Sequence, residues 1–163
     1  MAEYHLYDVA RSLTLAAADA IADAALAAGR AADLLPLTVA VLDAGGHTVV
    51  LKREDGCGIA RAGIATGKAA AALGMGIPTR TIRDRLADRP AFQAQIAAAT
   101  DGRFVGVPGG VLILNADGRA IGAVGISGDA SDRDEYAAIA EGIEKVTPTE
   151  CENFFAAAGY DQD

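Results

Sequence analysis

The sequence lacks tryptophan and contains few aromatic residues of any kind. Aromatic residues make up 5% of its 163 residues, whereas hydrophobic residues make up 52%, and many of these are alanine. A core with few large rings is built from small side chains, so we expect its helices and strands to approach one another closely. Charged residues make up only 22% of the chain, which excludes a disordered protein, and the length favours one domain over residues 1–163.

Cysteine and basic residues are also scarce. Cys57 and Cys151 are the only cysteines and form no CxxC pair, which argues against a disulfide framework and a structural zinc site and fits a reducing cytoplasm. The net charge of −8 argues against binding to nucleic acid or to an anionic membrane, because both need a basic surface. The N-terminal stretch lacks a basic region followed by an apolar one, and Asp19 and Asp23 interrupt the next apolar segment. We therefore expect neither a signal peptide nor a membrane span.

The spacing of the apolar residues predicts an α+β domain with a core over about 13–146. Gly45-Gly46 and Asp117-Gly118 are turn signals within two predicted hairpins. Thr81 with Asp84, and Thr149 with Glu152, resemble capping boxes at helix starts. The predicted strands cover 37–43, 47–53, 110–114 and 119–126, and the predicted helices cover 14–29, 59–73, 81–87, 90–99, 133–146 and 149–159. This order indicates an antiparallel sheet with helices packed against it.

The stretch GIATGKAA at residues 63–70 looks at first like the end of a phosphate-binding loop. Such a loop needs four residues between its first glycine and the Gly-Lys pair, and a Ser or Thr after the lysine. Here only three residues separate Gly63 from Gly67, and Ala69 follows Lys68. The segment also lies inside a predicted helix, so a nucleotide site is excluded. The simplest interpretation of Lys68 is a solvated charge on a helix surface.

Four stretches of the chain, taken in this order and spacing, resemble the GlcG/HbpS family, which includes the C-terminal domain of PduO-type proteins. They are VLDAGGHTVVLKREDG (41–56), ATGKAA (65–70), PGGVLIL (108–114) and GAVGISGDASDRDEYAAIA (122–140). The resemblance covers residues 13–146, which is most of the chain.

The resemblance implies a profilin-like sandwich, in which an antiparallel sheet of about five strands is flanked by helices. It also implies a homo-oligomeric small-molecule binding protein whose ligand is haem or another tetrapyrrole. Lys68, Gly109-Gly110 and Ser127 match the family motifs and are implied to contribute to ligand binding. The alanine-rich stretch 69–72 is a candidate contact between subunits, and packing of this helix on the sheet is the simpler alternative.

His47 is the first candidate for chemistry, because it follows Gly45-Gly46 near a hairpin tip. Imidazole titrates near neutral pH and binds metals, so His47 is a candidate haem-iron ligand or general base, with a surface turn histidine as the alternative. The hairpin should bring Asp43 to the same end as His47. Arg53 and Asp55 should lie at the opposite end, where Arg53 offers a bidentate partner for a carboxylate or a haem propionate. The alternative there is an exposed ion pair of little energetic consequence.

Two further groups combine reactive or charged side chains with a helix start. Cys57 lies between two glycines just before a helix, where backbone N–H groups and the helix dipole favour a thiolate. The simpler interpretation is a small buried apolar residue. Asp132, Asp134 and Glu135 begin the last long helix, where acidic residues suit the dipole. Together with Ser127, they are also candidates for a pocket mouth.

An enzyme without an organic cofactor is the alternative function. Arg53 and Lys68 would then hold the carboxylate of a small anionic metabolite. His47, Asp55 or Cys57 would move a proton or attack the substrate, as isomerases, hydratases and hydrolases require. An oligomeric scaffold without any ligand is the third possibility.

Overall fold

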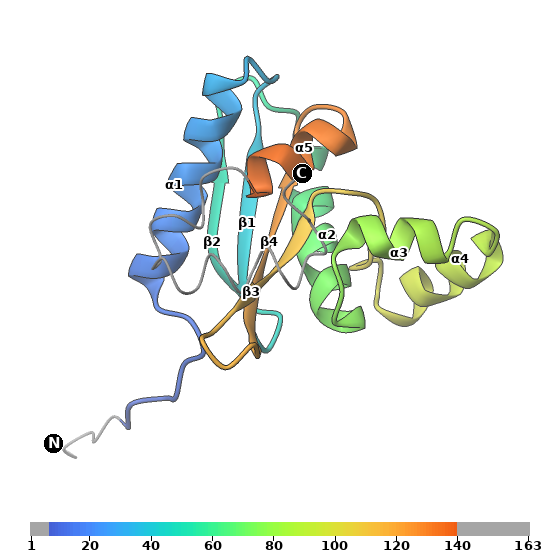
Figure 1. The fold of residues 1–163 in the computed structure, drawn as a ribbon, viewed down its shortest axis with the longest axis horizontal. Coiled ribbons are helices and arrows are strands. Elements are labelled where there is room, and N and C mark those ends of the chain that lie inside the picture. The colour runs from blue at the N-terminus through green and yellow to red at the C-terminus, as the bar shows by residue number, and fades with distance from the viewer. Residues whose placement is uncertain (1–6, 140–163) are drawn as a thin grey trace, which may run out of the picture.

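The computed structural model describes residues 7–139, which form five helices and four strands. In chain order these are α1 (Leu15–Ala31), β1 (Thr38–Asp43), β2 (Thr48–Arg53), α2 (Ala60–Met75), α3 (Thr79–Arg85), α4 (Pro90–Ala99), β3 (Gly110–Leu114), β4 (Ala120–Ser127) and α5 (Ser131–Ile139) (Figure 1). Both predicted hairpins are present. The predicted helix 149–159 and its capping box lie outside the described residues.

The four strands form one antiparallel sheet in the order β2-β1-β4-β3. Its central pair joins the two hairpins, with Thr38 opposite Ser127 and Asp43 opposite Gly122. The expectation of about five strands is wrong for residues 7–139, because each hairpin supplies two strands and the elements between the hairpins, α2 to α4, are helices.

Helices cover both faces of this sheet (Figure 1). On one face, α1 packs against β1 and β2 while α5 packs against β3 and β4, and on the other face α2 packs against β1, β3 and β4. Alternation along β1 supplies both cores, because Val39 and Val41 belong to the cluster with α1 whereas Leu42 packs with α2. Helices α3 and α4 project from the side of this sandwich (Figure 1).

Small residues let α2 lie very close to the sheet. A Cβ atom added at Gly125 would overlap the carbonyl oxygen of Ala65, and one added at Gly110 would overlap that of Lys68. Ala69 and Ala72 face this contact and pack on Leu42 and Ala123 of the sheet, whereas Ala71 is fully buried against Ile82, Leu86 and Phe104. The simpler interpretation of residues 69–72, packing of this helix on the sheet, is confirmed for Ala69 and Ala72.

Helix α3 begins two residues before the predicted capping box. Pro78 is its N-cap, so the prediction that Thr81 and Asp84 form a capping box is wrong. The hydroxyl of Thr79 accepts a hydrogen bond from the backbone N–H of Gly110 at 2.8 Å and lies 3.2 Å from its carbonyl oxygen, to which it donates. This contact with the edge strand β3 fixes the helix start, and such a contact leaves no local signal in the sequence. No helix within residues 7–139 combines the length and the apolarity needed to cross a bilayer.

Candidate functional site

The tip of the β1–β2 hairpin is organised by the carboxylate of Asp43. Its Oδ1 accepts hydrogen bonds from the backbone N–H groups of Gly45 and His47, both at 2.9 Å. Gly46 follows with a φ of +79°, a conformation that favours glycine. The N–H of His47 is the main reason that the pKa of Asp43 lies below its usual value, with the N–H of Gly45 adding to it and burial opposing it. Asp43 is therefore ionised at neutral pH.

The imidazole of His47 lies beside this carboxylate and is open to solvent. Its Nδ1 is 3.4 Å from Oδ1 of Asp43, and its side chain is 82% exposed. A Cβ atom at Gly45 would lie 2.9 Å from Nδ1, so the ring rests against that glycine. The prediction that Asp43 and His47 share one end of the hairpin is confirmed. Since Nδ1 faces the carboxylate, Nε2 is the nitrogen that can bind a metal.

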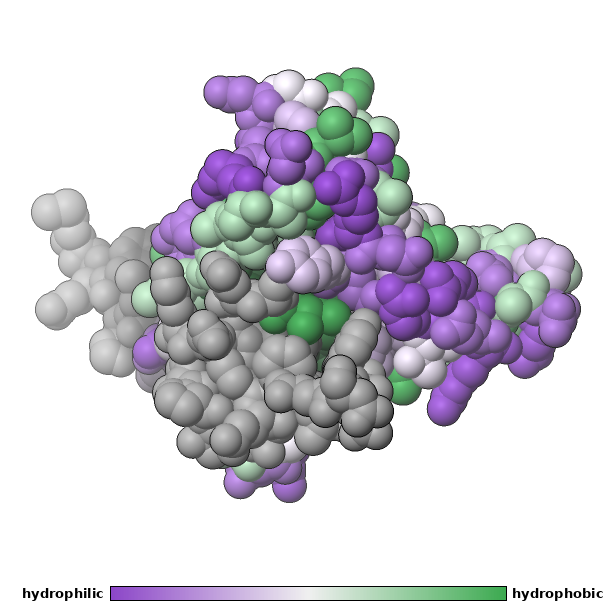
Figure 2. Space-filling view, turned by 45° about the horizontal axis from the view of Figure 1, so that its top comes forward, coloured by the Kyte–Doolittle hydropathy of each residue, from purple (hydrophilic) through white to green (hydrophobic). Residues whose placement is uncertain are grey.

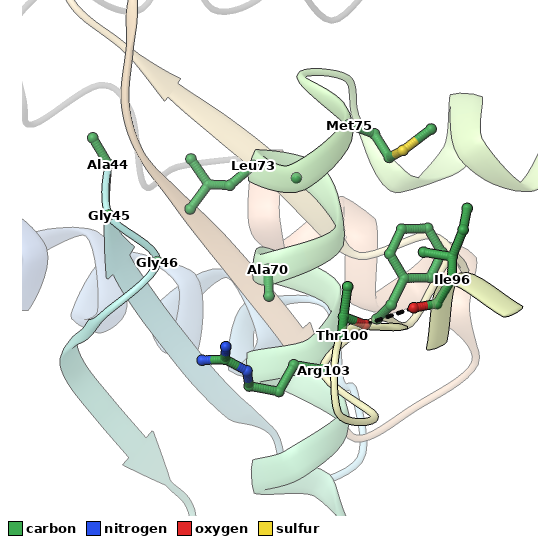
Figure 3. Close-up of a pocket in the computed structure, with 11 residues that line it drawn as sticks. Ala44, Gly45, Gly46, Ala70, Leu73, Met75, Ile96, Thr100 and Arg103 are labelled. Atoms are coloured by element: carbon green, nitrogen blue, oxygen red, sulfur yellow. Dashed lines mark hydrogen bonds between the residues drawn. The ribbon is translucent and has the colours of Figure 1, made fainter. Parts of the chain in front are cut away.

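A pocket of about 320 Å³ begins at this turn and lies between the turn, α2 and the loop that follows α4 (Figure 3). Gly45 and Gly46 form its rim on the hairpin side. Its walls are mainly apolar and include Ala70, Leu73, Met75, Ile96 and Phe104. His47 is not among the residues that line this pocket, and Gly45, which the imidazole approaches closely, lies between the two.

Arg103 is the cation of this pocket. Its side chain extends from the loop after α4 toward the Gly45–Gly46 turn (Figure 3). Within residues 7–139 its guanidinium makes no hydrogen bond or ion pair, although its backbone N–H donates to the carbonyl of Thr100 at 3.0 Å. Our sequence analysis missed this residue. The only local signal is an arginine next to Phe104 and just after a glycine with positive φ, Gly102.

Lys68 lies in the interior of the domain. Its side chain is 1% exposed, and its Nζ donates hydrogen bonds of 2.8 Å to Oδ2 of Asp134 and to the carbonyl of Ile126. Burial lowers the pKa of Lys68, while the Asp134 carboxylate opposes this effect. The interpretation of Lys68 as a solvated charge is therefore wrong, because a carboxylate inside the protein compensates its charge. Because it is buried, Lys68 is also inaccessible to the carboxylate of an external ligand.

The Gly109-Gly110 pair makes room for this buried lysine. Gly109 has a φ of +115°, and a Cβ atom there would lie 2.9 Å from both Nζ of Lys68 and the carbonyl oxygen of Ile126. Gly110 contacts the backbone of the same lysine. The structure thus gives both glycines a role in packing α2 against the sheet.

The acidic start of α5 is paired with basic residues of α3. Glu135 is 2% exposed, and its Oε2 accepts a hydrogen bond of 2.6 Å from Nε of Arg80. Asp132 accepts one of 2.8 Å from Nη2 of Arg80 and one of 3.4 Å from Arg83. Figure 2 shows that hydrophilic residues cover much of the described surface in this view. Charge compensation between helices accounts for these acidic residues in addition to the helix dipole.

Cys57 is buried at the opposite end of the sheet from the hairpin tip. Its Sγ lies 3.1 Å from Oγ1 of Thr38 and 4.0 Å from the carbonyl of Ser127. The hydroxyl of Ser127 accepts a hydrogen bond of 3.2 Å from Arg61. The simpler interpretation of Cys57, a small buried residue, is the one that the structure supports.

The residues proposed for a cofactor-free enzyme are not assembled into one site. Arg53 pairs with Thr38 at the far end of β2 from His47, and Asp55 follows it there. Cys57 and Lys68 are both buried. The prediction that Arg53 and Asp55 lie at the opposite end of the hairpin from His47 is confirmed, so His47 and Arg53 cannot act together in one site of this chain.

We expect Cys57 to resist alkylation in the folded protein. In a Cys151→Ser background, iodoacetamide at pH 7 should label the native protein slowly and should label it rapidly in urea, because a thiol must reach solvent to react. Mass spectrometry over time measures both rates. Native labelling as fast as that in urea would contradict the burial of this thiol.

Comparison with known proteins assigns the chain to a family. The model of the haem degrading protein HbpS-like family matches residues 13–143. The chain belongs to the HbpS-like family. It is 31% identical over 128 residues to an uncharacterized 15.0 kDa protein from the dhaT-dhaS intergenic region of Citrobacter freundii, an alignment that covers 78% of this chain and 87% of that protein.

Solved structures of HbpS-like folds agree with this assignment. The crystal structure of HbpS is similar over 90% of this chain and 99% of its own, with a TM-score of 0.71 and 30% identity. A crystal structure of a PduOC:heme complex is similar over 86% of this chain and 94% of its own, with a TM-score of 0.70 and 23% identity. The resemblance inferred from the four sequence stretches is confirmed.

Proposed function

We propose that this HbpS-like protein binds haem or a related tetrapyrrole at the β1–β2 hairpin tip, with His47 as the iron ligand. The observation that carries this proposal is an exposed imidazole whose Nδ1 lies beside an ionised carboxylate, next to a mainly apolar pocket. The PduOC relative crystallised with heme supports the choice of ligand class.

The residues at the tip fit a haem better than a bare metal ion. Within residues 7–139, no group of three or more His, Cys, Asp or Glu side chains is placed to hold a metal. A porphyrin already supplies the four equatorial nitrogens of its iron, so one imidazole from the protein is sufficient. Asp43 would orient that imidazole and increase the basicity of Nε2, as carboxylates commonly do for metal-bound histidines.

The turn next to His47 also suits a flat ring. Gly45 and Gly46 place no side chains on the hairpin side of the pocket, so a planar ligand can approach the backbone there. Bound haem would supply a redox-active iron. The residues of this chain would hold that iron, orient its ligand and shield one edge of the ring with the apolar walls of the pocket.

A hemin titration tests this proposal. Purified protein is titrated with hemin and followed by absorbance, beside His47→Ala and, as a matched control, His5→Ala, which removes the other histidine of the chain. We expect a saturable Soret shift in the wild type and in His5→Ala, and its loss in His47→Ala.

Each other outcome contradicts part of the proposal. A shift that survives in His47→Ala would overturn His47 as the ligand and retain haem binding. No saturable shift in the wild type would overturn haem binding itself.

A further inference from the structure

We propose that Arg103 binds a carboxylate of the ligand that His47 holds, so that the site selects tetrapyrroles with free carboxylate groups. The inference rests on the proposed function and adds a second point of attachment to it. It assigns the specificity of the site to a residue outside the four stretches that resemble the GlcG/HbpS family.

The first argument is that the side chain of Arg103 is exposed and has no protein partner within residues 7–139. Its guanidinium points across the pocket and makes no hydrogen bond or ion pair with residues 7–139 (Figure 3). A guanidinium presents several N–H donors in a planar fork that matches a carboxylate. The same fork also matches a phosphate, and of the two anions a tetrapyrrole carries the carboxylate.

The second argument is that other donors at the pocket are already used. The backbone N–H groups of Gly45 and Gly46 donate to the side chain and the carbonyl of Asp43, respectively. The hydroxyl of Thr100 donates to the carbonyl of Ile96 at 2.9 Å. An anion in this pocket thus depends on Arg103, while the apolar walls favour an apolar body. The ligand is amphipathic.

The third argument is the position of the pocket relative to His47. A volume of about 320 Å³ is at the lower end of the range for ligand sites, so the pocket takes one edge of a tetrapyrrole and not the whole ring. Gly45 contacts His47 on one side and lines the pocket on the other. The proposal therefore places the ring along this turn, with its iron at the imidazole and a carboxylate at its edge beside Arg103.

The overall charge of the protein makes a local cation important. A chain with a net charge of −8 repels a ligand that carries two carboxylates. The propionate partner predicted from the sequence, Arg53, lies at the far end of β2 from His47. Arg103 lies beside the same turn as His47 and so replaces Arg53 in this role.

The experiment compares ligands with and without iron and with and without free carboxylates. Hemin, metal-free protoporphyrin IX and the dimethyl ester of each are titrated into the wild type, Arg103→Ala and Arg103→Lys. Arg85→Ala is the matched control, because it removes an equal charge from a position outside the pocket lining. Far-ultraviolet circular dichroism of each variant verifies the fold.

We expect Arg103→Ala to weaken binding of both free acids about tenfold, the loss expected when a hydrogen-bonded charge pair is removed from a partly exposed site. The dimethyl esters should bind the wild type as weakly as the free acids bind Arg103→Ala, and should not respond to the substitution. Arg103→Lys should be intermediate, and Arg85→Ala should match the wild type.

The iron-free ligand separates this inference from the proposed function. Protoporphyrin IX that binds equally well to the wild type and Arg103→Ala would overturn the role of Arg103 while leaving His47 in place. Binding that depends on Arg103, together with equal hemin affinity of His47→Ala and the wild type, would overturn His47 as the iron ligand. It would retain Arg103 as the carboxylate partner. Equal losses in Arg85→Ala and Arg103→Ala would overturn the inference in favour of overall charge. Failure of both porphyrins to bind the wild type would overturn both proposals.

Discussion

Replacing Lys68 with methionine is expected to lower the free energy of unfolding by about 3–5 kcal/mol, the loss typical when one partner of a buried ion pair is removed. Lys68 and Asp134 each have a side-chain exposure of 1%. Without the ammonium group, the Asp134 carboxylate stays buried without its counter-charge, and the carbonyl of Ile126 loses a donor. Urea unfolding followed by circular dichroism measures the change.

Two further variants identify the cause of that loss. Lys68→Met combined with Asp134→Leu removes both charges, and we expect it to recover most of the lost stability, because apolar pairs can replace buried ion pairs. Lys52→Met is the matched control at a half-buried lysine, whose salt bridges join it to Asp19 and Asp23 on α1. It should cost about 1 kcal/mol or less. A similar small loss in Lys68→Met would show that the Lys68 pair is not buried in solution.

Gly125→Ala is expected to cost about 3 kcal/mol or more, at the upper end of the range for overpacking substitutions. The added Cβ atom would overlap the carbonyl oxygen of Ala65 and lie 2.7 Å from the backbone nitrogen of Ala69. Both are main-chain atoms of α2, so no side chain can rotate away and the helix itself must shift. Thermal and urea unfolding measure this loss.

Gly63→Ala is the matched control for that substitution. Gly63 lies in the same helix α2, and a Cβ atom there meets no neighbour within 4 Å. The alanine should stabilise the protein by about 0.5–1 kcal/mol, because it lowers the conformational entropy of the unfolded chain and favours helix. Equal effects at Gly63 and Gly125 would contradict the close approach of α2 to the sheet.

The sequence predicted those parts of the fold that short-range chemistry determines. Gly45-Gly46 and Asp117-Gly118 set the two hairpins, because these turns need residues that tolerate positive φ. Gly46 and Gly118 do have φ values of +79° and +72°. The start of α3 was predicted wrongly because the hydroxyl of Thr79 pairs with Gly110, which is 31 residues away in sequence.

The same distinction separates the predicted and the missed parts of the candidate site. Asp43 and His47 are four residues apart, so a single turn brings them together. Lys68 and Asp134 are 66 residues apart and belong to helices on opposite faces of the sheet. A lysine is buried only where a partner such as Asp134 compensates its charge. The spacing of apolar residues along α2 gives no information about that partner. Arg103 was missed for the same reason, since only the tertiary fold places it beside the hairpin turn.

The two sides of the pocket differ in their resistance to local unfolding, because α4 projects from the sandwich. No residue of α4 is buried, whereas β1, which carries the hairpin turn on the other side, is almost entirely buried. Local unfolding free energies follow such differences in packing. Helix α4 packs on the domain only through half-buried side chains such as Phe92 and Ile96, so we expect its backbone amides to exchange with solvent faster than those of β1. At the proposed site, the α4 side of the pocket would therefore open more readily than the hairpin side.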